Sequence, residues 1–387
     1  MLNFDTIIIG GGASGCMCGL SCSASNIAII DNNNKIAKKL LITGNGRCNL
    51  TNLKMKSKFF NQDISLYLDR YNVSSTLDFF ASLGLMTFSD EENRVYPISN
   101  SAKSVVNVIE NAINKSNINV FLEHCVEKIV KEGDNFIITT NKESFTCNNL
   151  VLATGKSELL DCLKIEYKNF MPSLCALKTK STRTLSNIRL RDVKVEACVN
   201  GKSISDIGEV LFKDSGLSGI AIFNISSLFA REGKFDGKVT IDMLPKEDTE
   251  SLIKMLQKRK TLNCLVRQFF DGMFVKEVAY EIFNRCKIDE NKPSIRITAQ
   301  EIENFAHTIK SLDFTVKGYY PNNQVFSGGV KLSDLDENLQ HKQIKNLYFC
   351  GEICDIDGQC GGYNLQWAWT SGHIVGNALN SNIGGKK

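Results

Sequence analysis

The sequence predicts an α/β protein in which a domain built on a parallel sheet is interrupted by a β-rich insert and a small helical insert. Three observations support this fold class. A buried strand, a glycine-rich turn, a helix and a second buried strand fill residues 4–31, which is the make-up of a βαβ unit. Between residues 173 and 245 the pattern changes to short strands separated by turn residues. Residues 346–379 then return to a buried strand, a glycine-rich loop and a helix.

Length and composition limit the class of protein. The chain has 387 residues, of which 43% are hydrophobic and 23% are charged. This is ordinary globular usage, and it indicates two or three domains rather than a disordered chain. The net charge of +4 neither requires nor excludes nucleic acid. No apolar run reaches the roughly 18 residues of a membrane span, so we expect no membrane contact.

The N-terminus and the cysteines bear on location. The first residues have no basic segment ahead of an apolar one, so we expect no signal peptide. The 14 cysteines are scattered without a Cys-x-x-Cys pair, which favours free thiols and argues against a dithiol oxidoreductase. The group at positions 350, 354 and 360 has no histidine beside it, so we expect no metal site. We therefore expect a cytoplasmic protein.

The first motif joins the opening strand, residues 4–9, to a helix. Gly10 permits a tight turn, Gly12 lets backbone approach a pyrophosphate, and Gly15 permits close packing of helix on strand. Asp31 ends the second strand, where a carboxylate can bind ribose hydroxyls. The unit predicts dinucleotide binding and does not choose between FAD and NAD.

The remaining elements follow from hydrophobic periodicity. Helices are expected over 16–24, 74–84, 101–115, 247–286, 298–311 and 364–379. Strands are expected over 27–30, 119–130, 135–140, 150–155, 193–199, 239–243 and 346–350, with 119–130 and 135–140 antiparallel.

The second motif, residues 40–52, reads Leu-Leu-Ile-Thr-Gly-Asn-Gly-Arg-Cys-Asn-Leu-Thr-Asn and follows the second strand at once. The motif contains Gly44, Gly46, an arginine and three asparagines. Such residues are poorly suited to a hydrophobic core and well suited to a loop that binds a ligand. A solvated turn with asparagine caps is the structural alternative. We expect a loop folded over the cofactor.

The third motif spans residues 350–366. Gly361 and Gly362 precede a helix, whose free N–H groups could stabilise negative charge on the pyrimidine ring of a reduced flavin. Glu352 or Asp357 is expected to bind sugar hydroxyls. The alternative is a capped surface helix. The two tryptophans of this helix, 367 and 369, are expected to pack in the core rather than to stack on a ligand.

Together the three motifs resemble the BaiN/YhiN-like FAD-dependent oxidoreductases, which are aminoacetone oxidase-like flavoproteins. The resemblance rests on residues 10–15, 39–52 and 351–376. Weaker matches lie at 94–97, 151–155, 208–219 and 326–330. It implies an FAD-binding Rossmann-like domain of the two-dinucleotide-binding type, interrupted by a β-barrel-like insert and a small helical insert.

We expect three domains on this basis. Their limits are 1–172 plus 318–387 for the FAD domain, 173–245 plus 294–317 for the β-rich domain, and 246–293 for the helical subdomain. The motifs and the resemblance together assign cofactor contacts to Gly10, Gly12, Ala13, Ser14, Gly15, Asp31, Lys39, Gly44, Gly46, Asn49, Val126, Thr154, Gly155, Gly351, Glu352, Asp357, Gly362, Tyr363, Asn364 and Leu365.

The sequence departs from the family after Gly155. Family members usually continue with a second glycine and a Ser-Tyr-Pro…Thr-Gly-Ser…Gly-Asp-Gly loop near the cofactor and the substrate. Here Gly155 is followed by Lys-Ser-Glu-Leu-Leu-Asp. This departure leaves the substrate open and keeps a non-catalytic FAD-binding protein among the alternatives.

The resemblance implies hydride transfer to a C=C bond conjugated with a carbonyl, either in a bile-acid ring or in a pyrimidine of ribosomal RNA. Such a step needs a proton donor and a group that holds the enolate oxygen. Tyr96 or Cys48 is the candidate donor, and Arg47 or Arg94 is the candidate for the oxygen. Their structural alternatives are a packed turn for Tyr96, a solvated charge for Arg94 and an inert buried thiol for Cys48.

Four hypotheses remain from the sequence. The preferred one is a reductase of a small conjugated carbonyl, with NAD(P)H as a transient electron donor because no second glycine fingerprint follows a strand. The others are a flavoenzyme acting on RNA, an amine oxidase and a non-catalytic FAD-binding protein. The RNA hypothesis rests on basic residues that an ordinary solvated helix face also explains: Lys254, Lys258, Arg259, Lys260 and Arg267. The oligomeric state is left open.

Overall fold

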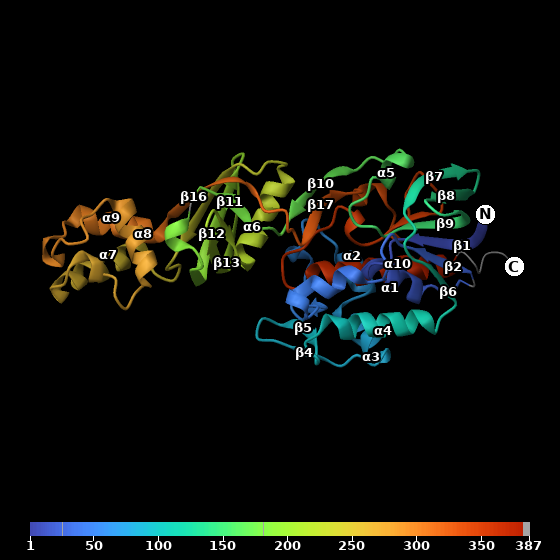
Figure 1. Ribbon diagram of the computed structural model, residues 1–387, viewed down its shortest axis with the longest axis horizontal. Coiled ribbons are helices and arrows are strands. Elements are labelled where there is room, and N and C mark those ends of the chain that lie inside the picture. Colours follow the sequence, from blue (N-terminus) through green and yellow to red (C-terminus); the bar gives the residue numbers. More distant parts are fainter. Residues whose placement is uncertain (25, 181, 382–387) are drawn as a thin grey trace. The chain divides into compact units, whose positions relative to one another are not determined.

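The computed structural model describes residues 1–387 except 25, 181 and 382–387 (Figure 1). The chain divides into two compact units, one made of residues 1–171 and 325–387 and the other of residues 172–324. The chain therefore leaves the first unit once and returns to it once. None of the helices in the described part of the chain is long and apolar enough to cross a membrane.

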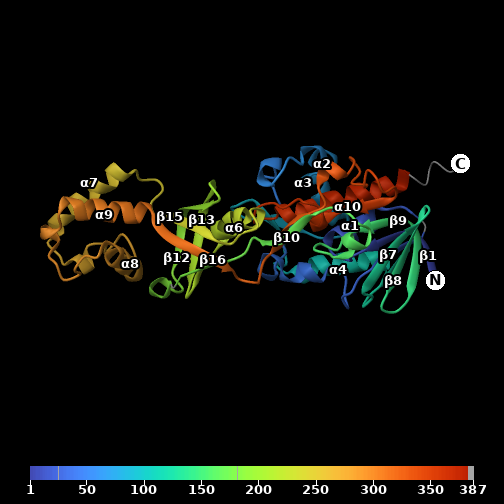
Figure 2. The same ribbon diagram turned by 90° about the horizontal axis from the view of Figure 1, so that it is seen from above.

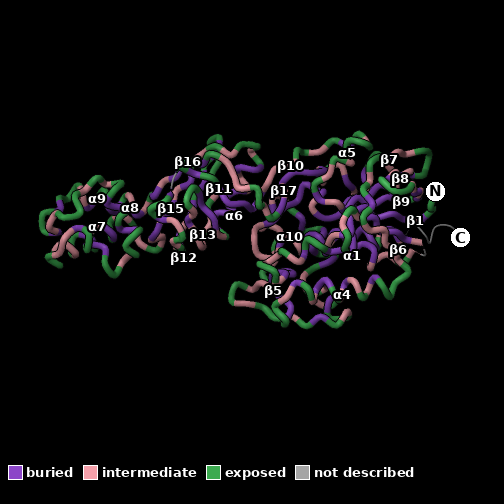
Figure 3. The backbone as a smooth tube through the Cα atoms, viewed as in Figure 1, coloured by how far each residue is buried: buried purple, intermediate pink, exposed green. Residues whose placement is uncertain are grey.

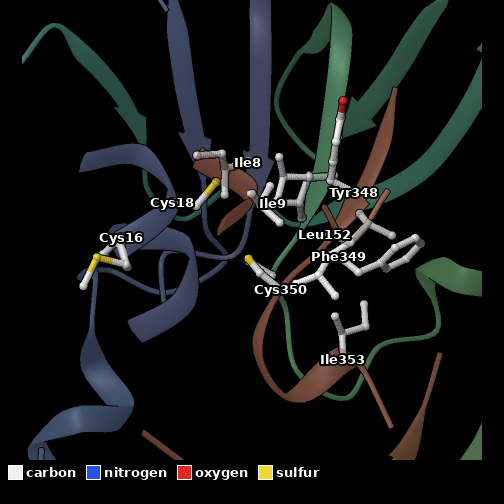
Figure 4. Packing of buried hydrophobic residues seen from close by; sticks show 14 of the residues in the cluster. Ile8, Ile9, Cys16, Cys18, Leu152, Tyr348, Phe349, Cys350 and Ile353 are labelled. Atoms are coloured by element: carbon white, nitrogen blue, oxygen red, sulfur yellow. The ribbon is translucent and has the colours of Figure 1, made fainter. Parts of the chain in front are cut away.

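The first unit is built on a seven-stranded sheet of described residues, in the order β6-β2-β1-β9-β8-β7, with β18 paired to β9. The strands are β1 (Leu2–Ile9), β2 (Ile27–Ile30), β6 (Ile118–Phe121), β7 (Val126–Glu132), β8 (Asn135–Thr140), β9 (Ser144–Leu152) and β18 (Leu347–Phe349). Strand β1 pairs in parallel with both β2 and β9. Ile8, Leu152 and Phe349 from three neighbouring strands lie together in the core (Figure 4).

One sequence prediction was wrong in this sheet. Residues 119–130 do not form one antiparallel strand, because β6 pairs in parallel with β2 and the chain turns before β7 begins at Val126. Glu123, at φ 57°, lies in that turn. Alternating side chains report which face of a sheet a residue lies on and carry no information on the direction of the partner strand.

Two helices, α1 (Ala13–Ser21) and α10 (Tyr363–Ser381), pack along each other in the first unit (Figure 2). Two glycines of α10 permit a close approach of the backbones. A Cβ on Gly372 would lie 2.4 Å from the Ser14 carbonyl oxygen, and one on Gly376 would lie 2.6 Å from that of Cys18. Trp367 and Trp369 are buried in the core, as predicted.

Smaller elements complete the first unit. The helices are α2 (Ser65–Arg70), α3 (Val73–Ser82), α4 (Ala102–Asn114) and α5 (Leu159–Cys162). A three-stranded sheet has the order β3-β5-β4, with β3 (Thr51–Asn52), β4 (Thr87–Ser89) and β5 (Arg94–Pro97). Strands β10 (Lys168–Ser173) and β17 (Val325–Gly329) form a two-stranded sheet.

The second unit contains a closed barrel, in the order β11-β14-β13-β12-β15-β16. Its strands are β11 (Leu177–Thr179), β12 (Arg189–Val199), β13 (Lys202–Lys213), β14 (Gly216–Ser218), β15 (Gly237–Asp242) and β16 (Leu312–Tyr319). Every second residue of β12 from Val193 to Val199 is buried, so one face of the strand lines the barrel core (Figure 3). Helix α6 (Ile220–Arg231) packs on β12 and β13.

The helical part of the second unit comprises α7 (Thr249–Arg259), α8 (Lys276–Cys286) and α9 (Ala299–Lys310). Phe270 packs against Phe283 and Phe305 at ring distances of 5.3 and 5.2 Å. The predicted helix over 247–286 is interrupted between α7 and α8 by short 3-10 turns. Asn263, at φ 49°, ends the first helical stretch in the left-handed region.

The predicted fold class is confirmed. A mixed α/β domain with a parallel sheet carries an inserted closed β-barrel and additional helices. The limits of the three predicted domains stay a prediction.

Candidate cofactor site

The first glycine motif leaves space at the N-terminus of α1. A Cβ on Gly15 would lie 1.9 Å from the Gly10 carbonyl oxygen, so the packing of the protein itself requires this glycine. A Cβ on Gly12 would meet no atom of the described residues within 4 Å. Gly12 is also the N-cap of α1, and no side chain caps the helix there. Open space at the positive end of a helix fits a pyrophosphate.

Asp31 is held rigidly at the carboxyl end of β2. Its Oδ2 accepts a hydrogen bond from the Gly11 N–H at 2.6 Å, and its Oδ1 accepts one from the Asn33 N–H at 2.7 Å. The His124 N–H donates to the Asp31 carbonyl oxygen at 3.0 Å, which places the turn before Val126 beside Asp31. Val126 follows two residues after this contact, and its role and that of Asp31 in binding the adenosine half stay predictions.

The second motif has an irregular backbone. Gly44, Asn45 and Cys48 have φ values of 55°, 56° and 60°. The Cys48 N–H donates to the Thr43 carbonyl oxygen at 3.0 Å, and a Cβ on Gly44 would lie 2.9 Å from the Asn49 nitrogen. Asn49 is 8% exposed, and its Oδ1 has no hydrogen-bond partner within the part of the chain that the structure describes.

The second and third motifs meet at the N-terminus of α10. A Cβ on Gly362 would lie 2.6 Å from the Thr51 carbonyl oxygen and 2.9 Å from Asn49 Oδ1. Asn52 Nδ2 donates to the Gly361 carbonyl oxygen at 3.1 Å. Gly361 and Gly362 have φ values of 125° and 97°, so both positions favour glycine.

A buried polar network fixes this junction, and sequence reasoning missed it. Gln366 accepts from Thr51 Oγ1 at 2.7 Å and donates to Thr76 Oγ1 at 2.8 Å and to Thr370 Oγ1 at 3.1 Å. All four side chains are fully buried. The available signal was a glutamine between leucine and tryptophan on a helix that is otherwise apolar there.

The other residues of the first turn of α10 hold the preceding loop. Asn364 accepts from the Gly358 N–H and donates to the Gly358 carbonyl oxygen, each at 2.8 Å. The Tyr363 ring packs on Phe59 at 4.8 Å. Leu365 is half-buried. Asn364 therefore shapes the loop through its side chain, and its backbone N–H lies in the first turn, where helices bind anions.

The Glu352 carboxylate lies close to residues from several segments that were predicted to contact the cofactor. Its Oε1 accepts from the Phe326 N–H at 2.9 Å, and Lys39 Nζ lies 3.9 Å from its Oε2. A Cβ on Gly155 would lie 3.7 Å from Oε2. The adjacent Gly351 packs on the first motif, since a Cβ there would lie 2.4 Å from Ser14 Oγ.

The remaining predicted contact residues lie within or directly next to the elements described above. Asp357 is buried, and its Oδ2 accepts from Ser327 Oγ at 3.0 Å. Thr154 directly precedes Gly155 after the end of β9, and Ala13 begins α1. Gly46 lies in the irregular loop at φ 80°.

Glu352 gives the apoprotein a pH dependence. Burial raises the pKa of its carboxyl group above 4.5, against the lowering effect of Lys39 and of the Phe326 N–H. The folded state therefore holds a proton that the unfolded state releases, and stability should fall as pH rises above about 4.5 toward the raised value. Each pKa unit corresponds to about 1.4 kcal/mol.

Unfolding of the apoprotein in denaturant at several pH values measures this effect. The free energy of unfolding should fall with rising pH in the parent chain and should fall less in Glu352→Gln. The exposed Glu91→Gln is the control, and an equal flattening in both variants would contradict the assignment.

The candidate catalytic residues are only partly brought together. The Arg47 guanidinium lies over the Tyr96 ring, 4.2 Å from its centroid, and its Nη2 donates to Tyr96 Oη at 3.3 Å. Arg94 instead forms ion pairs with Asp90 at 2.7 Å and Glu92 at 2.6 Å. Their roles stay predictions.

Cys48 is fully buried, and burial raises the pKa of its thiol to about 12. A thiol held so far from ionisation fits packing better than proton transfer at neutral pH. Among the residues that the structure describes, no group of three His, Cys, Asp or Glu side chains could hold a metal ion.

The arrangement of these site residues fits a dinucleotide that carries a polar ring at the end opposite the ribose that Asp31 would bind. Asp31 fits a ribose, the space at Gly12 fits a pyrophosphate, and Glu352 fits the hydroxyls of a second sugar-like chain. The buried acceptor Asn49 Oδ1 fits a hydrogen-bond donor of the ligand. These are the groups that FAD presents.

Comparison with known proteins supports this interpretation. A family model described as "HI0933-like protein Rossmann domain" matches residues 4–378. The 3-dehydro-bile acid delta(4,6)-reductase of Clostridium scindens is 30% identical over 96% of this chain and 98% of that protein. The ribosomal RNA dihydrouridine synthase of Escherichia coli is 27% identical over 96% of each chain.

A solved structure is also similar. It is the crystal structure of 3-ketosteroid delta1-dehydrogenase from Sterolibacterium denitrificans, in complex with 1,4-androstadiene-3,17-dione. The similarity covers 99% of this chain and all of that chain, with a TM-score of 0.52 and 10% sequence identity. The last likeness concerns the fold alone.

Proposed function

The chain belongs to the HI0933-like Rossmann family of FAD-dependent oxidoreductases, and from this premise we propose that it reduces a C=C bond conjugated with a carbonyl in a small molecule, with NAD(P)H as the electron donor. The observation that carries the proposal is the contact of Arg47 with Tyr96 beside the second motif. A relative named as a bile acid delta(4,6)-reductase, 30% identical over nearly the whole chain, supports the same class of reaction.

FAD would be held by the backbone at Gly12, by Asp31 and Glu352, and by the junction of the second and third motifs. When bound, FAD supplies the hydride chemistry. The protein contributes position, exclusion of water and control of a proton.

Tyr96 would supply the proton, and Arg47 would stabilise the negative charge that develops on the substrate. Burial raises the pKa of the Tyr96 phenol, against the opposing effects of the Arg94 and Arg47 charges, so the phenol carries its proton at neutral pH. A protonated phenol within reach of the substrate can give its proton to the carbon next to the carbonyl. The Arg47 guanidinium, 3.3 Å from Tyr96 Oη, can hold the negative charge that develops on the carbonyl oxygen.

The first experiment is an anaerobic absorbance titration of the FAD-loaded protein with NADPH and then with NADH. Bleaching of the flavin band, followed by reoxidation with an enone such as a 4-ene-3-ketosteroid, supports the proposal. Bleaching without reoxidation by any enone would overturn the choice of substrate class. A flavin band that no nicotinamide bleaches would overturn the choice of donor and favour the amine oxidase or the non-catalytic alternative.

Tyr96→Phe is expected to lower kcat for enone reduction about 100-fold or more, because loss of a positioned acid typically costs this factor. The bleaching of FAD by nicotinamide should be unchanged, since that half-reaction needs no proton from Tyr96. Stopped-flow measurement of the two half-reactions separates these effects. Tyr280→Phe, on the exposed face of α8, is the control. An equal loss in both half-reactions would show that Tyr96 acts on the fold rather than on the substrate.

RNA is the second candidate substrate, because two relatives are named as ribosomal RNA dihydrouridine synthases. The basic residues in segment 254–267 give RNA as a substrate only weak support, because one of them is engaged in contacts within the protein. Arg259 donates through Nε to the Phe269 carbonyl oxygen and through Nη2 to that of Asp271, each at 2.8 Å, which is a structural role. Binding of a ribosomal RNA fragment that weakens steeply with added salt would favour RNA.

A further inference from the structure

Asn49 Oδ1 is a buried hydrogen-bond acceptor that has no partner among the residues that the structure describes. Its side chain is 8% exposed, and Oδ1 lies 2.9 Å from where a Cβ on Gly362 would stand. A buried polar atom without a partner costs on the order of 1–3 kcal/mol, which a protein retains where a ligand supplies the partner. Gly362 packs so closely against the Thr51 backbone and Asn49 Oδ1 that no side chain fits there, and the end of α10 therefore lies directly beside the Asn49 acceptor.

The backbone around Asn49 is held in a strained form by several independent contacts. Cys48, directly before it, has φ 60°, which is costly for a residue with a Cβ. Directly after it, the Leu50 N–H donates to the Val95 carbonyl oxygen at 2.8 Å, and Trp369 Nε1 donates to the Leu50 carbonyl oxygen at 3.0 Å. Strain that is over-determined in this way is typical of a functional position.

Hydrogen-bond donors lie beside this acceptor. Helix α10 begins at Tyr363, and its first intrahelical bond runs from the Gln366 N–H to the Gly362 carbonyl oxygen at 3.0 Å. The N–H groups of the first three helical residues therefore have no acceptor within the helix. The bond from Thr51 Oγ1 to Gln366 holds this helix end against the strand that follows Asn49. The site thus presents one acceptor next to a set of donors.

The pyrimidine edge of the isoalloxazine ring has the complementary pattern, because its N3–H donor stands between two carbonyl acceptors, C2=O and C4=O. We infer that Asn49 Oδ1 accepts the hydrogen bond of the flavin N3–H while the N-terminus of α10 receives a flanking carbonyl oxygen. The inference rests on the proposed function, since it takes FAD as the ligand. It makes Asn49 the residue that fixes the ring edge, with Gln366 as a positioning residue behind the helix end.

The test compares FAD with N3-methyl-FAD, which lacks the N3–H and carries a methyl group in its place. Apoprotein is titrated with each cofactor, and the dissociation constants are measured by quenching of flavin fluorescence. Wild-type protein should bind N3-methyl-FAD about 10- to 100-fold more weakly than FAD. The reason is that Asn49 Oδ1 would lose its hydrogen-bond donor and would also clash with the N3-methyl group. Asn49→Ala removes both the acceptor and the obstacle, so it should bind the two cofactors within a few-fold of each other.

Two controls separate this role from a structural one. Asn45→Gly lies in the same loop on its exposed side, keeps the left-handed backbone and should discriminate as wild type does. Asn52→Ala removes the contact to Gly361 and should weaken both cofactors equally. Equal affinity of wild-type protein for FAD and N3-methyl-FAD would overturn the inference and leave the proposed function standing. Failure of wild-type protein to bind FAD at all would overturn both.

Discussion

Replacement of Gly12 by alanine is expected to weaken FAD binding about 100-fold and to leave the free energy of unfolding of the apoprotein nearly unchanged. The backbone at Gly12, at φ −76° and ψ −167°, is open to alanine, and the new Cβ would meet no atom within 4 Å in the part of the chain that the structure describes. The methyl group would instead enter the space at the N-terminus of α1, where a pyrophosphate would contact the backbone. Fluorescence titration gives the dissociation constant, and denaturant unfolding of the apoprotein gives the stability.

Gly15→Ala is the matched contrast within the same motif. Its Cβ would lie 1.9 Å from the Gly10 carbonyl oxygen, so the helix and the strand would have to separate. This variant should lose several kcal/mol of stability before any cofactor is added, as overpacked cores do. Unchanged FAD affinity in Gly12→Ala would contradict the assignment of the pyrophosphate to this turn.

The second large effect is expected for Gln366→Leu. Leucine has a similar volume and cannot serve the hydroxyl groups of Thr51, Thr76 and Thr370, all of which are fully buried. Thr76 and Thr370 keep their hydrogen bonds to the Asn72 and Tyr71 carbonyl oxygens, so the hydroxyl of Thr51 is the group that loses its partner. A buried polar group left without a partner costs on the order of 1–3 kcal/mol. We therefore expect a loss of about 1 to 3 kcal/mol in the free energy of unfolding, together with weaker FAD binding.

The measurement is urea unfolding of the apoprotein, together with FAD titration. Gln300→Leu, on the exposed face of α9, should change stability by less than about 0.5 kcal/mol. Equal, small effects of the two substitutions would show that the network around Gln366 contributes nothing beyond packing.

The parts of the fold that local chemistry dictates were predictable from the sequence. The glycines of the first motif and the apolar run before them define β1, the turn and α1, and the structure places all three there. The change of pattern after residue 173 indicated a β-rich insert, and the structure contains a closed barrel of described strands between residues 177 and 319.

Other features depend on partners that are distant in the chain. Strand β6 pairs in parallel with β2, about 90 residues earlier, and no local pattern reports that direction. The network around Gln366 joins residues roughly 300 positions apart, so its polar members look like isolated residues in the sequence. Arg94 was a candidate for the substrate oxygen, yet its charge is taken up by two carboxylates only two and four residues away. Side-chain pairing of this kind is decided by rotamers, which residue types alone do not determine.

The junction of the second and third motifs has a consequence for synthesis on the ribosome. The opening βαβ segment is made before the partners that complete it, because β18 and α10 come much later in the chain. Until Gly372 and Gly376 arrive, α1 lacks the helix that packs on its backbone, and Asn49 lacks the helix end that it faces. A nascent chain therefore carries the glycine fingerprint without a completed site until α10 has been made, and the cofactor can stabilise the native state only from that point on.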